Sequence, residues 1–334
     1  MKTNKNSTII CLIFFSTITV ATSQQSELRL FKSIPENTVD QSGTYLIHPY
    51  DLSISEDLIF IADAKDCCIK VFNKEGIFIR KIGSRGKGPG ELLDPFVIAI
   101  DDKNKLLYCD DKTNGRISVF QTNGNFMRAI RVFLPYYDIA ILKENLFTSS
   151  FNDINSTLFC KYNSTGKLIR SFGNMIDKNH KEYYYARTLY ESELYSDGKY
   201  LYTFFIKLPL INVYSSDGEL ITTINLIENE LEKIREKNIE GAIERIETGF
   251  IPVKSWLFGA YIKNSNIYCY SRTIGNKMFV FNNDGKLIKS LLLNCGNETA
   301  ISKQLFFRHI DNNGKFYFAD IAHAKIRIFT EYNR

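Results

Sequence analysis

Residues 58–101 read LIFIADAKDCCIKVFNKEGIFIRKIGSRGKGPGELLDPFVIAID, and this stretch decides the fold. It contains three short apolar runs, a glycine-rich connector and then a fourth apolar run that starts at Pro95. The runs are four to seven residues long and rich in Ile, Val and Phe, which is typical of strands. Between the second and third runs, Asn73-Lys-Glu-Gly76 has the composition of a hairpin turn.

Weaker copies of this unit recur to the end of the chain. A turn that ends in glycine appears five times, at Asn73–Gly76, Gln121–Gly124, Asn163–Gly166, Ser215–Gly218 and Asn282–Gly285. The first copies lie roughly 40 to 50 residues apart, the period of a four-stranded propeller blade. An apolar strand precedes each turn, and a sixth such strand, Ile326–Phe329, lies near the C-terminus. The sequence therefore predicts an all-β, six-bladed β-propeller.

Two segments outside the repeats complete this predicted architecture. The sixth unit ends at Arg334 without an outer strand, and the alternating segment Leu28–Ile34 can supply one, closing the ring from the N-terminus. Residues 228–247 have apolar residues on one face and many charges on the other, which predicts one helix inserted between blades four and five. We expect it to dock on the ring, with a mobile lid as the alternative.

The N-terminus resembles a secretory leader. Lys2 and Lys5 precede an apolar run from Ile9 to Val20, and Ala21-Thr22-Ser23 follows as a small-residue cleavage pattern. We predict a signal peptide at 1–23 and a propeller at 24–334, with a periplasmic or secreted location. The alternative is that residues 1–23 are not cleaved and remain as an N-terminal anchor. After cleavage, no apolar run in the remaining chain would be long enough to be a transmembrane segment.

Composition restricts the partners and cofactors. The formal net charge of +5 is mild and contains no basic block, so we expect no nucleic-acid partner. The seven cysteines include no CxxC pair, and the histidines include no HxH or HExxH spacing. We therefore expect no cofactor.

The opening stretch resembles an NHL repeat. The resemblance lies in Val71–Gly76, in the connector Ile82–Glu91 and in Pro95–Asp101, and it is good over residues 58–133 and looser beyond. With the leader, the whole chain is similar to exported bacterial six-bladed propeller proteins of NHL type. Some propellers of that type are lyases that hold a metal with histidines from several blades. That resemblance makes His48 and His309 the candidate ligands for an alternative metal site.

The loops predict which face binds a ligand. In a four-stranded blade the glycine hairpins open on one face, whereas the connectors between blades and both insertions open on the other. Because long loops on a rigid scaffold concentrate binding residues, we expect the connector face, around the mouth of the central channel, to be functional. The candidate ligand-binding residues on that face are Arg85, Lys87, Tyr183, Tyr184, Tyr185, Arg187 and Trp256.

These residue types point to recognition. Tyr, Trp and Arg are enriched in binding hot spots, although ordinary loop packing accounts for them equally well. Gly86–Gly90 lacks the GxxxxGK[ST] pattern of a phosphate loop, so we interpret it as a connector between blades. The prediction is an exported, non-enzymatic propeller that binds a peptide, glycan or protein partner. A metal-dependent lyase or hydrolase with its site in the central channel, and a structural subunit of an envelope assembly, are the alternatives.

Overall fold

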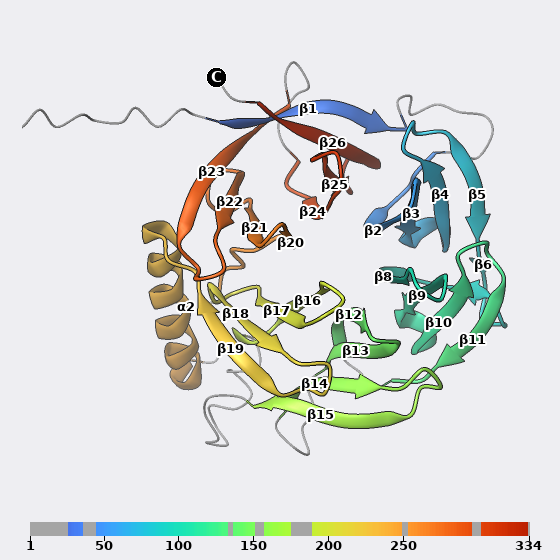
Figure 1. Ribbon diagram of the computed structural model, residues 1–334, viewed down its shortest axis with the longest axis horizontal. Helices are drawn as coiled ribbons and strands as arrows, with labels where there is room; N and C mark the ends of the chain where they lie inside the picture. The colour runs from blue at the N-terminus through green and yellow to red at the C-terminus, as the bar shows by residue number, and fades with distance from the viewer. Residues whose placement is uncertain are drawn as a thin grey trace, which may run out of the picture.

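The computed structural model describes residues 26–35, 45–132, 136–150, 157–174, 189–248, 253–295 and 302–332. Figure 1 shows their strands arranged in sheets around a central axis, with one helix outside the ring. The predicted signal peptide, residues 1–23, lies outside the described residues. Among those that are described, no helix is both long and apolar enough to cross a lipid bilayer.

Four of the sheets are four-stranded antiparallel blades. The first contains β2 (Pro49–Ser55), β3 (Leu58–Asp63), β4 (Cys68–Asn73) and β5 (Phe78–Ile82). The second contains β8 (Pro95–Asp101), β9 (Leu106–Asp111), β10 (Arg116–Gln121) and β11 (Phe126–Ile130). The third contains β12 (Tyr136–Leu142), β13 (Asn145–Ser150), β14 (Thr157–Tyr162) and β15 (Leu168–Asn174). The fourth contains β16 (Ser192–Ser196), β17 (Leu201–Phe205), β18 (Leu210–Tyr214) and β19 (Leu220–Asn225).

The remainder of the ring is one eight-stranded sheet in the order β20-β21-β22-β23-β1-β26-β25-β24. Its strands are β1 (Glu27–Ile34), β20 (Ala260–Lys263), β21 (Asn266–Ser271), β22 (Lys277–Phe281), β23 (Leu287–Asn294), β24 (Leu305–Ile310), β25 (Phe316–Asp320) and β26 (Lys325–Tyr332). The prediction of a six-bladed propeller is therefore wrong. The chain forms a propeller-like ring of four blades and one larger sheet.

Strand β1 causes this difference. On one edge it pairs antiparallel with β26, from Glu27 opposite Tyr332 to Ile34 opposite Ile326. On its other edge it pairs in parallel with β23, where Leu28 lies opposite Leu293. A strand in the middle of a sheet has two hydrogen-bonding edges. Here both are used, so units expected to be separate become one sheet.

The five glycine hairpins form where the sequence predicts them. Gly76, Gly124, Gly166, Gly218 and Gly285 all have positive φ, between 77° and 109°. In each turn the glycine amide donates to the carbonyl of the residue three positions earlier. Gly285 also has a packing reason to lack a side chain, because a Cβ there would lie 2.0 Å from the Asn225 carbonyl oxygen.

The hydrophobic core lies in layers between neighbouring sheets. One layer joins the first two blades and includes Phe60, Val71, Ile98 and Phe120. Inner strands therefore bury side chains on both of their faces. Their free edge is turned to the centre of the ring, as Figure 1 shows for β2, β8, β12, β16, β20 and β24. The backbone of these six strands positions the side chains of the central cavity.

The predicted helix is present as α2 (Asn229–Thr248). The Glu228 carboxylate accepts the backbone amides of Glu230 and Leu231 at 2.6 and 3.0 Å, which satisfies free donors at the helix start. Leu231 is fully buried in the core layer that also contains Ile211 and Phe279. In Figure 1 the helix lies outside the ring beside β19 and β23, so it docks on the rim, away from the central cavity.

The glycine-rich segment is a connector with a short parallel pair, β6 (Ser84–Arg85) and β7 (Glu91–Leu92). Arg116 fixes this loop, because its Nη2 donates to the carbonyls of Gly88 and Glu91 at 2.9 and 2.8 Å. Two single turns of 3-10 helix, Ala64–Asp66 and Lys112–Asn114, follow the second strands of the first two blades.

Candidate functional site

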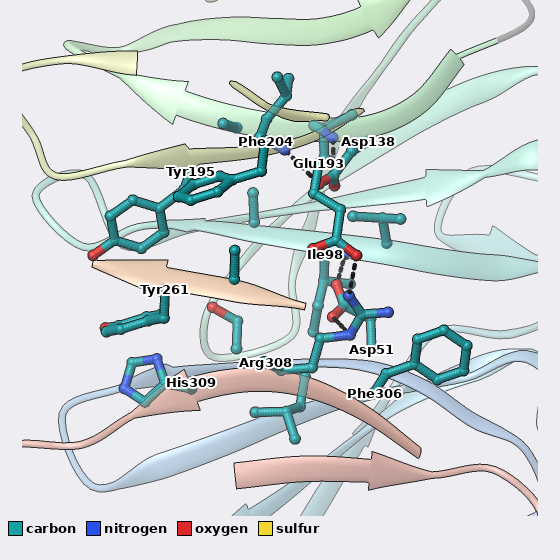
Figure 2. Close-up of a pocket in the computed structure, with 18 of the residues that line it drawn as sticks. Asp51, Ile98, Asp138, Glu193, Tyr195, Phe204, Tyr261, Phe306, Arg308 and His309 are labelled. Carbon is teal, nitrogen blue, oxygen red and sulfur yellow. Dashed lines mark hydrogen bonds and ion pairs between the residues drawn. The ribbon is translucent and has the colours of Figure 1, made fainter. Parts of the chain in front are cut away.

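A cavity of about 450 Å³ lies where the inner strands meet. Residues from all six inner strands line it, and Figure 2 shows the side chains that converge there. A cavity of this size with a few converging polar groups is the usual form of a ligand site. It is therefore the candidate functional site of the protein.

Charged side chains occupy the middle of the cavity. Asp51 comes from β2, Asp138 from β12, Glu193 from β16 and Arg308 from β24. Arg308 Nε lies 3.0 Å from Asp51 Oδ1, and Arg308 Nη1 lies 3.4 Å from Glu193 Oε1. We call these four residues the central charge cluster. Asp51 and Glu193 share the guanidinium of Arg308 and Asp138 has no ion pair with it, so the cluster carries an excess of negative charge when all of its groups are ionised.

Two of these carboxylates also join neighbouring inner strands. Asp51 Oδ2 accepts the backbone amide of Ile98 on β8 at 3.0 Å. Asp138 Oδ2 accepts the amide of Leu194 on β16 at 2.8 Å. Such amides on the free edge of an inner strand have no ladder partner, and leaving them buried without an acceptor would be costly. The cluster therefore has a structural role as well as a place in the cavity.

The cavity shifts the pKa values of the cluster. Burial raises the pKa of Asp51 and of Glu193, and the positive charge of Arg308 opposes part of each shift. Burial raises the pKa of Asp138 well above its usual range, and the carboxylate of Glu193 adds to that shift. For Arg308, burial lowers the pKa, but Asp51 and Glu193 outweigh it and the net shift is upward. Arg308 therefore stays charged while the acids compete for it.

The aromatic rings of Tyr50, Phe258 and Phe306 line the cavity, and Phe96 packs against Tyr50. We call these four residues the aromatic collar. The ring centroids of Tyr50 and Phe96 are 3.5 Å apart, those of Tyr50 and Phe306 are 6.0 Å apart, and those of Phe258 and Phe306 are 6.2 Å apart. Each ring is partly exposed. Together they form an apolar surface of the kind on which ligand groups stack.

Two cations lie on the collar. Lys112 Nζ lies 4.2 Å from the centroid of the Phe96 ring. The Arg272 guanidinium lies 3.7 Å from the Phe258 centroid and 4.9 Å from that of Phe306. These are cation–π distances. Lys112 lines the cavity and Arg272 lies over two collar rings, so the collar carries cations whereas the centre of the cavity is acidic.

The collar opens on the face that the loops predict to be functional. Tyr50, Phe96 and Phe306 each lie within two residues of the start of an inner strand. Because the strands of a blade alternate in direction, the starts of inner strands and the turns after the second strands share one face. The glycine hairpins lie on the opposite face.

Polar aromatic residues line the other end of the cavity. In Figure 2, Tyr195, Tyr261 and His309 lie on the side of the charge cluster opposite Phe306. The ring centroid of Tyr261 lies 4.9 Å from that of Tyr195 and 4.8 Å from that of His309. Burial lowers the pKa of His309 to about 4, so this imidazole is neutral at pH 7.

The sequence-predicted residues do not gather in the cavity. Arg85 and Lys87 are exposed on the connector; Arg85 Nη2 donates to the Lys65 carbonyl at 2.9 Å, and the Lys87 carbonyl accepts from Arg116. Neither residue lines the cavity. Tyr183, Tyr184, Tyr185 and Arg187 lie outside the described residues.

Trp256 follows α2 and is only 1% exposed. Its indole N–H donates to the Phe205 carbonyl at 3.2 Å, which fixes the ring in the core. Of the two candidate metal ligands, His309 lines the cavity and His48 does not. Within the described ranges, no group of three or more His, Cys, Asp or Glu side chains is arranged to hold a metal ion.

Sequence reasoning missed the central charge cluster and the aromatic collar. The inner strands contain a usable signal, because Tyr50-Asp51, Phe96-Val97 and Tyr137-Asp138 occupy matching places near their strand starts. Aligning inner strands, rather than hairpins, would have shown an aromatic residue near each of these three strand starts, followed by an aspartate in two of them. The four charged residues are far apart in the sequence, so no local motif marks them.

The fold and the cavity define a propeller-like protein. Residues 43–207 match the family model described as a domain of unknown function, DUF4934. None of the curated proteins matches the sequence significantly.

Solved structures share the fold at low sequence identity. A protein of Bacteroides fragilis NCTC 9343 described as exported has 13% identity and a TM-score of 0.63, covering 95% of this chain and 97% of its own. Virginiamycin B lyase from Staphylococcus aureus has 12% identity and a TM-score of 0.55, covering 92% and 99%. The WD40 repeats of RRP9 have 11% identity and a TM-score of 0.52, covering 92% and 79%. At these identities the likeness is one of fold.

Proposed function

We propose that this chain is an exported binding protein that recognises a peptide, glycan or protein partner at the collar mouth of its central cavity. The observation that carries the proposal is the aromatic collar, three of whose rings line a cavity of about 450 Å³. Partly exposed rings at a concave site offer a large contact area with little loss of side-chain freedom on binding.

Export is supported by the leader-like N-terminus and by the exported description of the Bacteroides fragilis protein. The resemblance of residues 58–133 to NHL repeats stays a prediction and is compatible with the same function. The proposed location is the periplasm or the exterior of the cell.

The metal-dependent lyase alternative has less support. It needs several ligands at one point, and only one of its two candidate histidines lines the cavity. The fold likeness to virginiamycin B lyase does not transfer that enzyme's activity, since the identity is 12%.

Array screening tests the proposed function. The chain without residues 1–23 is applied to glycan and peptide arrays, and hits are measured in solution by calorimetry. Phe306→Ala should weaken the affinity for a hit at least tenfold, because the ring forms part of the entrance. Phe31→Ala is the control, since this exposed aromatic lies on β1 outside the cavity. Equal affinity of both variants for every hit would reject binding at the collar.

A further inference from the structure

The central charge cluster has more carboxyl groups than cations to pair with them. Arg308 is shared by Asp51 and Glu193. Asp138 accepts the backbone amides of Ile139 and Leu194, but it forms no ion pair within the described part of the chain. A buried carboxylate normally has a charged or strongly hydrogen-bonding partner. The cavity can therefore accept one further cationic group.

A second, independent observation points to the same place. Ser192 precedes Glu193 on β16, lines the cavity and is 1% exposed. Its hydroxyl group has no hydrogen-bond partner among the described residues. Buried polar groups are nearly always paired, so an unpaired hydroxyl in a cavity wall indicates a group that is absent from the protein alone.

The charge changes sign along the cavity. Lys112 and Arg272 lie over collar rings, whereas Asp138 and Glu193 belong to the central charge cluster. An isolated cation meets repulsion at the entrance and attraction inside. A ligand matches both regions if its positive end enters first and reaches the acidic cluster. Its carbonyl or carboxylate groups then remain near Lys112 and Arg272 at the collar.

We propose that the ligand is a peptide with a free amino terminus, which enters the collar with its ammonium group first and places that group between Asp138 and Glu193. This inference rests on the proposed function and narrows its ligand class. Peptide side chains contact the collar rings, and the ammonium group supplies the missing donor to Asp138, Glu193 and the Ser192 hydroxyl.

Acetylation of the amino terminus is the direct test, because it removes the charge with little change in the rest of the peptide. A random tetrapeptide library is prepared in a free form and in an isotopically labelled N-acetylated form. The two forms compete for the immobilised chain without residues 1–23. Retained peptides are counted by mass spectrometry. We expect the free forms to be retained at least tenfold over the acetylated forms.

Amide variants connect this preference to the cluster. Asp138→Asn and Glu193→Gln remove the ionisable carboxyl group but keep a side-chain oxygen for the backbone amides that these residues accept. Each should reduce the free-to-acetylated ratio at least fivefold. Asp284→Asn, on an exposed hairpin of the opposite face, is the matched control and should leave the ratio unchanged. Thermal unfolding and circular dichroism confirm that each variant is folded.

The outcomes separate this inference from the proposed function. Retention of acetylated and free peptides in equal amounts, lost on Phe306→Ala, would overturn the amino-terminal preference but leave binding at the collar intact. Retention of array glycans alone would have the same meaning. No retention of any peptide also overturns the inference. If no array ligand depends on Phe306, the proposed function fails as well.

Discussion

At the scale of single residues, Arg308 makes two kinds of contact, and both stabilise the ring. It balances Asp51 and Glu193 in the cavity, and its Nη2 donates to the Tyr50 carbonyl at 3.4 Å. Since the acids also join neighbouring sheets, removing Arg308 leaves charge without compensation in a partly buried place. The cluster that we associate with the ligand therefore also holds the ring together.

We expect Arg308→Met to lower the free energy of unfolding by about 3 to 5 kcal/mol, the usual cost of breaking a buried ion pair by removing one partner. Urea denaturation followed by circular dichroism measures it. Lys103→Met is the control, because the Lys103–Glu144 pair is exposed, with 79% and 52% of the two side chains accessible. That variant should unfold at nearly the same urea concentration as the parent. Similar losses in both would contradict a special role for Arg308.

Asp138 should make stability depend on pH. Burial raises the pKa of Asp138 well above its usual range, and Glu193 and Asp51 add to the shift while Arg308 opposes it. In the unfolded chain the same carboxyl group titrates near pH 4. Above pH 4, until the folded pKa is passed, the folded state keeps a proton that the unfolded state has lost. The free energy of unfolding therefore falls as the pH rises through this window.

Asp138→Asn removes this titration while Asp51 and Glu193 stay in both proteins. The free energy of unfolding of the variant, relative to the parent, should rise as the pH increases above 4 and level off once the pKa of Asp138 in the folded protein is passed. Denaturation curves at half-unit steps measure the difference. A constant difference across this range would show that Asp138 has an ordinary pKa in the folded protein.

At the scale of elements, β1 is the strand on which the eight-stranded sheet depends. Leu28 is fully buried in the core layer that contains Leu293 and Phe329. Phe31, three residues later on the same strand, is 56% exposed. The two residues give a matched pair, because both are apolar and differ in burial.

Leu28→Ala should cost about 2 to 5 kcal/mol, because it leaves a cavity in a packed layer. Phe31→Ala should cost far less, although Lys315 lies over its ring. Chemical denaturation of the two variants measures both losses. An equal cost for the two would mean that β1 is not packed as the structure shows.

The elements also show what sequence can and cannot predict. The hairpins at Gly76 and Gly285 are local, since a positive φ and a turn-forming residue three positions earlier are enough to specify them. The helix at Asn229–Thr248 follows from its own periodicity. The pairing of β1 with β23 depends on which edges are left free once the whole ring has formed. The alternating pattern of residues 28–34 does not show whether this strand pairs with a neighbour on one edge or on both edges.

The candidate site was harder to predict for the same reason. Tryptophan is common in binding sites, but the indole N–H of Trp256 donates to the Phe205 carbonyl, which holds the ring in the core. Arg308 and Asp51 lie 257 positions apart in the chain and meet only because β24 and β2 are neighbours in the ring. Local sequence motifs specify turns and helix caps. The cavity forms only when the sheets close into a ring and bring distant residues together.

At the scale of the whole molecule, the ring has two different faces. The collar and its cations, Lys112 and Arg272, lie on one face, and the five glycine hairpins lie on the other. Cationic side chains of outer strands reach hairpin carbonyls of the next blade, as Arg170 does with Asp217 at 2.9 Å. The hairpin face therefore has a structural explanation for its regular features, and the collar face has features that packing does not require.

Hydrogen–deuterium exchange can distinguish the two faces. A ligand found by array or library screening should slow exchange at the starts of β2, β8 and β24 and in the turn around Lys112, because it would cover their backbone amides at the collar. The hairpins at Gly76 and Gly124 serve as internal controls, since they belong to the same blades and should exchange at unchanged rates. The Phe306→Ala variant with the same ligand should show no protection at the collar. Protection confined to the hairpins would place the binding surface on the opposite face and reject the collar as the site.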